Sequence, residues 1–122
     1  MYNKRVIGND KEQLVVKHLE SLGYHVLTTN YFCQAGEIDI IAKEKGYLVF
    51  IEVKYRSNVK NGYPEEAVTK RKMHAIIKTA NHYLLRHGLS FDSPCRFDVV
   101  VLLGEQIKVY ENAFMIDEGY IF

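Results

Sequence analysis

Charged residues stand at the centre or end of two runs of sequence that are otherwise typical of buried β-strands. Asp39 lies in the run 36–41, and Glu52 and Lys54 lie in the run 49–54. Moving an ion out of water costs on the order of several kcal/mol unless it is paired or holds a metal. We therefore expect these carboxylates either to bind a hard cation together or to be neutralised by neighbouring bases.

The spacing of the two runs predicts that the charged side chains meet. Lys45-Gly46 is typical of a tight hairpin turn between strands near 36–43 and 47–55. With that turn, paired residue numbers sum to 91, so Asp39 would lie opposite Glu52. Cross-strand neighbours start ~5 Å apart at Cβ, and alternation places Lys54 on the same face as Glu52.

Two interpretations fit these residues alone. Mg²⁺ prefers oxygen ligands and binds through few carboxylates, so it would relieve the repulsion between Asp39 and Glu52. A salt-bridge cluster made with Lys54 would do so without a metal. Glu12, on the apolar stripe of Val15 and Leu19, is either a first-turn partner of the helix dipole or an acid that points into the site.

The elements that would position these residues can be read on both sides of the hairpin. Asp10 and Gln13 fit a capping box that opens a first helix, and Gly23 fits its end. A strand over 24–29 and a loop over 30–35 would follow. The run 47–55 is apolar on both faces, which is typical of a central strand covered by helices.

A second helix and further strands complete the expected fold. Pro64 can open a long helix with an apolar stripe that includes Val68, and Gly88 ends it. Strands are expected over 97–103 and 107–110. The order αβββαβ predicts an α/β fold with a mixed sheet.

Composition predicts the class of protein more broadly. The 122 residues are 48% hydrophobic, enough for a single domain over 1–122 that buries a core without staples. Cys33 and Cys95 fit no metal-ligand spacing, and no run is apolar enough to span a membrane. A cytoplasmic protein is the expectation. The absence of a P-loop motif argues against nucleotide hydrolysis.

Positive charge is concentrated after the second charged strand. Between Lys54 and Lys78, seven basic and two acidic residues give a net charge of +5, whereas the rest of the chain carries −4. Such a segment fits a phosphate-binding surface, and a solvated helix face is the alternative. The residues expected to contact nucleic acid are Arg56, Lys60, Lys70, Arg71 and Lys72.

The acidic motif resembles that of a known group of enzymes. Gly36-Glu37-Ile38-Asp39, followed after twelve residues by Glu52-Val53-Lys54, resembles the PD-(D/E)xK nuclease signature. The chain as a whole is similar to the YraN-like family of small bacterial proteins, which resemble archaeal Holliday-junction resolvases in fold. The similarity covers the helix of Glu12, Gly23-Tyr24, Asn30, residues 36–41, 50–56 and 62–68, Lys72, Ala80 and residues 96–100.

This resemblance implies a restriction-endonuclease-like core and a role for each matching residue. Asp39, Glu52 and the carbonyl of Val53 would bind Mg²⁺ or Mn²⁺. Lys54 would orient or deprotonate water, or stabilise charge on the phosphate, and Glu12 would act beside the metal. The implied activity is hydrolysis of DNA, branched or single-stranded, and a homodimer is expected if junctions are cut.

One residue departs from the pattern of this family, and three others are expected to lie outside the site. Met73 stands where many relatives would be expected to carry Gln, which favours the alternative of a nucleic-acid- or partner-binding module with little cleavage. Arg96 and Asp98 are expected to form a structural ion pair, and Tyr55 is expected to point away from the site.

Overall fold

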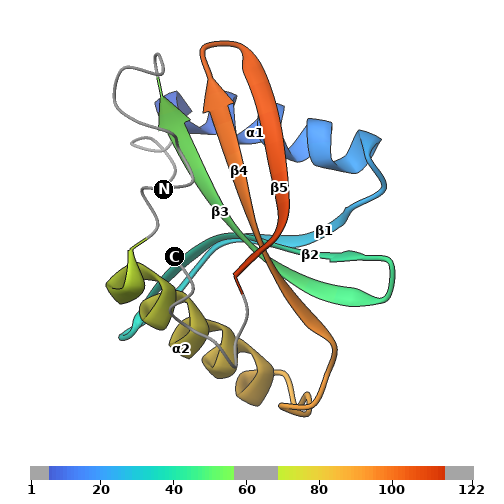
Figure 1. The fold of residues 1–122 in the computed structure, drawn as a ribbon, viewed down its shortest axis with the longest axis vertical. Coiled ribbons are helices and arrows are strands. Elements are labelled where there is room, and N and C mark those ends of the chain that lie inside the picture. The colour runs from blue at the N-terminus through green and yellow to red at the C-terminus, as the bar shows by residue number, and fades with distance from the viewer. Residues whose placement is uncertain (1–5, 57–68, 115–122) are drawn as a thin grey trace.

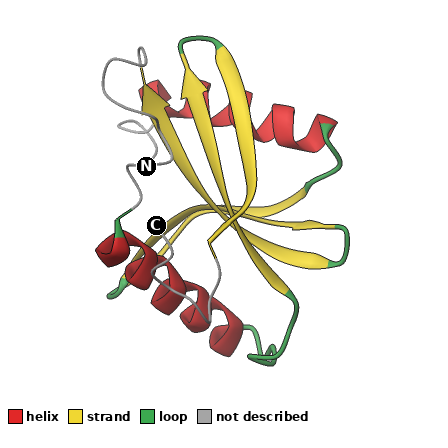
Figure 2. Ribbon diagram, viewed as in Figure 1, coloured by secondary structure: helices red, strands yellow, loops and turns green. Residues whose placement is uncertain are grey.

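The computed structural model describes residues 6–56 and 69–114, which form a five-stranded sheet and two helices (Figures 1 and 2). In chain order the elements are α1 (Val6–Ser21), β1 (His25–Cys33), β2 (Gly36–Glu44), β3 (Tyr47–Arg56), α2 (Lys70–Arg86), β4 (Cys95–Leu103) and β5 (Gln106–Phe114). This confirms the predicted α/β class with a mixed sheet, and the strand expected over 107–110 is β5. No helix in the described ranges is long and apolar enough to cross a membrane.

The sheet follows the order of the chain, β1-β2-β3-β4-β5, and only β3 and β4 run parallel. The β2–β3 hairpin has the predicted register, since Ile40 pairs with Ile51 and Glu44 with Tyr47. Lys45 and Gly46 both have positive φ (54° and 83°), as a two-residue turn of this kind requires. In Figure 1, β1 and β2 swing away from the direction of β3, β4 and β5.

Helices cover both faces of the central strand, as predicted. Leu48 and Phe50 belong to the core under α2, while Val49 and Ile51 belong to the core under α1. Alternating side chains of one strand therefore enter different layers. The site residues of β3 must divide between these layers in the same way.

Glycines end both helices where the sequence predicts. Gly23 has φ +100°, and the N–H groups of Gly23 and Tyr24 donate to the carbonyls of Glu20 and Leu19. That is the Schellman arrangement, which satisfies the last carbonyls of a helix. Gly88, with φ +67°, follows the end of α2 in the same left-handed region.

Three predicted boundaries are wrong. Asp10 is not an N-cap, because α1 already runs from Val6 and Asp10 lies exposed within it. Residues other than proline differ in helix propensity by at most ~1 kcal/mol. One aspartate is therefore not enough to end a helix that begins before it. The loop expected over 30–35 is mostly strand, since β1 continues to Cys33.

The second helix also begins later than predicted. Thr69 is extended (φ −80°, ψ 167°) and its side chain accepts from the N–H of Lys72, so α2 starts at Lys70 rather than at Pro64. A hydroxyl cap of this kind satisfies an orphan N–H and fixes the first turn. Pro64 and Val68 lie outside the described residues.

Candidate metal and catalytic site

The candidate site lies where β2 and β3 stop pairing. Their ladder ends at Ile40 and Ile51, one position before the predicted Asp39–Glu52 pair. There, Asp39 Oδ2 accepts a hydrogen bond of 2.7 Å from the backbone N–H of Val53. The carboxylate of Asp39 thus takes the place of a backbone acceptor at the point where the strands separate.

Asp39 carries the electrostatic signature of this site. Burial raises its pKa to about 7, and the charge of Glu52 raises it further than the Val53 hydrogen bond lowers it. Both effects disfavour the ionised form, because the carboxylate loses water and faces a like charge. Among the described residues, Asp39 forms no ion pair, and the nearby charge of Lys72 offsets these effects only in part.

Glu52 is neutralised more fully than Asp39. Its Oε2 lies 3.2 Å from Lys54 Nζ and 3.5 Å from Lys72 Nζ. The side chains of Glu52 and Lys54 are only 6% and 17% exposed, whereas Lys72, on the first turn of α2, is 43% exposed. The predicted neighbourhood of Glu52 and Lys54 is confirmed, and Lys72 joins them across the α2 layer.

Glu12 approaches from the opposite layer. It is half-buried on α1, and its Oε2 accepts a 2.9 Å hydrogen bond from Asn30 Nδ2. The pairs Thr29–Ile40 and Tyr31–Ile38 place Asn30 across β1–β2 from Asp39. Because α1 begins at Val6, Glu12 lies beyond the first turn, and the helix-dipole interpretation of this acid is wrong.

Tyr55 points away from the face of Glu52 and Lys54, as predicted, and lies on the α1 side of β3. Burial raises its pKa to about 12, and the charges of Asp39 and Glu12 contribute. Lys11 Nζ lies 5.9 Å from the centre of its ring. Alternation along β3 therefore puts Tyr55 beside the helix that carries Glu12.

The residues predicted to contact nucleic acid lie on two different elements, apart from one that is outside the described residues. Arg56 ends β3 and its guanidinium donates to the Tyr55 carbonyl at 3.0 Å. Lys70, Arg71 and Lys72 form the first turn of α2, and Lys72 reaches Glu52. Lys60 lies outside the described residues.

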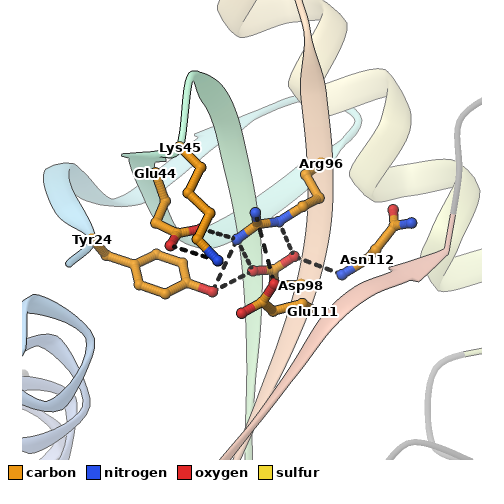
Figure 3. Close-up of polar contacts among 7 residues, drawn as sticks. All are labelled: Tyr24, Glu44, Lys45, Arg96, Asp98, Glu111 and Asn112. Atoms are coloured by element: carbon orange, nitrogen blue, oxygen red, sulfur yellow. Dashed lines mark hydrogen bonds and ion pairs between the residues drawn. The ribbon is translucent and has the colours of Figure 1, made fainter. Parts of the chain in front are cut away.

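A second buried charge cluster lies elsewhere in the sheet (Figure 3). Arg96 donates to both oxygens of Asp98 at 2.9–3.0 Å, which confirms the predicted ion pair. Tyr24 also donates to Asp98 at 2.7 Å, and the N–H of Asn112 donates at 2.9 Å. Glu44 Oε1 lies 2.8 Å from Arg96 Nη2, although the two are not aligned as a hydrogen bond.

The electrostatics of this cluster hold its arginine charged. Burial lowers the pKa of Arg96, but the hydrogen bonds and charge of Asp98, with the contact from Glu44, raise it overall. Burial and Asp98 likewise raise the pKa of Tyr24. The cluster is therefore a structural one, in which each acid faces a fixed positive charge.

The residues at Asp39 fit a magnesium-like cation. Two carboxylates in mutual repulsion and a nearby backbone carbonyl offer hard oxygen donors, and Mg²⁺ typically uses one or two carboxylates with water completing its shell. Within the described ranges, no group of three or more His, Cys, Asp or Glu side chains is arranged to hold a metal. A site here would therefore depend on Asp39, Glu52 and the Val53 carbonyl.

Met73 lies away from solvent. It is fully buried in the core between α2 and the sheet, one residue after Lys72. Its thioether can supply packing but no charge or strong hydrogen bond at this position.

Comparisons with known proteins place this chain in one protein family. The model of a family described as "Uncharacterised protein family UPF0102" matches residues 11–102. A UPF0102 protein of Lachnoclostridium phytofermentans is 54% identical over 112 residues, covering 92% of this chain and 95% of the relative. UPF0102 proteins of Saccharophagus degradans and Clostridium botulinum are 40% and 39% identical, over 91% and 94% of this chain and 94% and 98% of the relatives.

Proposed function

We propose that this chain, which belongs to the protein family UPF0102, is a metal-dependent nuclease that hydrolyses DNA phosphodiester bonds. One observation carries the proposal. Asp39 and Glu52 are held close enough that the charge of Glu52 raises the pKa of Asp39, with Lys54 beside them. A buried acid without an ion pair beside a second acid is a costly arrangement that cation binding would relieve.

Asp39, Glu52 and the Val53 carbonyl would hold Mg²⁺ or Mn²⁺. When bound, such an ion supplies positive charge that offsets the charge of the phosphate and makes water a better nucleophile. Because Asp39 must lose its proton to serve as a ligand, activity should rise with pH up to about 7 and then level off.

The side chains around the acids would carry the rest of the chemistry. Lys54 Nζ, already 3.2 Å from Glu52, would donate to a phosphate oxygen as negative charge grows on it. Glu12, held by Asn30, would accept a hydrogen bond from the attacking water and orient it. Water adds to phosphorus, one P–O ester bond breaks, and the leaving oxygen takes a proton.

The first turn of α2 supports binding of an anion such as DNA. Lys70, Arg71 and Lys72 stand at a helix N-terminus, where the helix dipole disfavours cations and acids are usual. The turn contains no acidic residue. A phosphate bound here would interact with both the dipole and the lysines, close to Glu52.

One observation favours a second candidate function. Glu52 already has two lysine partners, so the cluster can be neutral without a cation. With Met73 buried in the core, this describes a nucleic-acid- or partner-binding module that cuts little.

A cleavage panel separates the two functions. Single-stranded, duplex and four-way-junction DNA are incubated with the protein in Mg²⁺, Mn²⁺ or chelator, beside Asp39→Asn as the matched variant. The proposal predicts cleavage that needs both the metal and Asp39. DNA binding without metal-dependent cleavage of any substrate would favour the binding module instead.

A further inference from the structure

An open groove of about 550 Å³ lies between β1 and the second half of α2. Its floor is the run of residues 27–32, and its wall is formed by Tyr83, Arg86 and His87. We call it the β1–α2 groove. It lies at the opposite end of α2 from the basic first turn and is lined by different residues.

The lining combines aromatic rings with positive charge. Phe32 is 67% exposed, and Tyr31 packs edge-on against Tyr83 at 5.1 Å while its hydroxyl contacts His82 at 2.6 Å. Arg86 is exposed at the rim, and none of the described lining residues is acidic. Rings held in place beside an arginine suit a ligand with flat aromatic groups and negative charge.

The shape of β1 distinguishes between two kinds of ligand. β1 is an edge strand whose only strand partner among the described elements is β2, so an added peptide strand is the first alternative. However, the β1 register shifts between Val26 and Thr28, and Asn30 has φ +55°. These two irregularities interrupt the row of backbone donors and acceptors that strand addition needs. Recognition through side chains is therefore favoured over a peptide ladder.

One residue of the groove also contacts the candidate site. Asn30 belongs to its floor, donates to Glu12 and lies across from Asp39 in the β1–β2 register. A chain that lay along the groove would thus end beside the acids.

We propose that the β1–α2 groove binds a single strand of nucleic acid, a base of which stacks on the exposed ring of Phe32 and whose phosphates contact Arg86. The inference rests on the proposed function in that the bound strand would lead to the acids as substrate. Ungapped duplex would fit poorly, because its bases are already stacked on one another and cannot cover the protein's rings.

Binding is measured in a protein that cannot cut, so that the result is independent of cleavage. Asp39→Asn protein in chelator is titrated with a fluorescent oligo-dT of roughly 12 nucleotides, within the site sizes typical of such grooves. Adding Phe32→Ala should weaken binding about 5-fold or more, the loss of one stacked base, without altering the salt dependence. Adding Arg86→Ala should reduce the log–log salt slope by about 0.7, one phosphate contact on a single strand.

Two substitutions of the same type serve as controls. Phe91 is 62% exposed between α2 and β4, and Lys17 is exposed on α1; neither lines the groove. Phe91→Ala and Lys17→Ala should leave affinity and salt slope unchanged. If the controls weaken oligo-dT as much as the groove variants, or if duplex binds as tightly, the proposal is wrong.

An extended acidic peptide is titrated in parallel. If the peptide binds and loses affinity with Arg86→Ala while oligo-dT does not, the groove is a peptide site and the proposal is overturned. Failure of these binding tests would leave metal-dependent cleavage intact. If the cleavage panel shows no cleavage, binding of oligo-dT to the groove can still be measured and tested by itself.

Discussion

Arg96 and Asp39 illustrate two ways in which one small sheet handles buried charge. In the Arg96 cluster, Asp98 faces a guanidinium, a phenol and a backbone N–H (Figure 3). Asp39, by contrast, receives one backbone N–H and lies beside the like charge of Glu52. A buried charge that has its hydrogen-bonding and charged partners stabilises one fold. A buried acid without an opposite charge is instead a candidate position for binding a ligand.

The contrast predicts opposite effects of substitution, and the largest is expected at Arg96. Arg96→Ala would leave the buried acids Asp98 and Glu44 without their cation, which should lower the free energy of unfolding by ~3–5 kcal/mol. Urea unfolding measures the loss. Arg71→Ala, at an exposed position, should change stability by no more than ~0.5 kcal/mol. A loss below ~1 kcal/mol at Arg96 would remove the distinction between the clusters.

Lys54 should affect chemistry rather than stability. Its partner Glu52 keeps Lys72, so Lys54→Ala should fold normally. We expect single-turnover cleavage to fall ~100-fold, comparable to losing one oxyanion donor, because the lysine would act on charge that develops in the transition state. DNA affinity should stay within several-fold. A large loss of affinity at an unchanged rate would make Lys54 a binding residue.

Asp39→Asn should stabilise the metal-free protein. Folded Asp39 keeps its proton up to about pH 7. In the unfolded chain it releases the proton near pH ~3.9. The folded state therefore binds more protons between these pH values, so the free energy of unfolding falls as pH rises through that window.

Asparagine avoids that loss and keeps an oxygen for the Val53 N–H. In chelator above pH 7, we expect Tm to rise by about 4 °C or more, the shift expected for ~1 kcal/mol in a domain of this size. The gain should vanish near pH 4. A clearly lower Tm above pH 7 would mean that Asp39 is a structural partner like Asp98.

The sequence predicted the register of the β2–β3 hairpin more accurately than the bounds of the elements around it. The register of β2 and β3 followed from the turn at Lys45-Gly46, because a two-residue hairpin leaves one pairing that keeps apolar residues buried. The ends of α1 and α2 followed from Gly23 and Gly88, whose positive φ values favour glycine.

The predictions that the structure contradicts were wrong for local reasons. Asn30 adopts a left-handed conformation inside β1, so its stretch resembles a loop although tertiary pairing keeps it in the sheet. Asp10 resembles a cap because Asp is favoured at that position, yet nothing in the preceding residues stops the helix. The layer from which Glu12 approaches was not predicted, because the sequence does not show which face of the sheet α1 covers.

Calorimetric titration with Mn²⁺ tests the central claim most directly. We predict that the wild-type protein binds one Mn²⁺ through Asp39 and Glu52, with an affinity that falls about tenfold per pH unit below pH 7 as Asp39 takes up its proton. Glu52→Gln should abolish this binding, while Glu111→Gln, at a half-exposed acid of the Arg96 cluster, should retain it. Equal binding of Mn²⁺ by the wild type and Glu52→Gln would contradict the account.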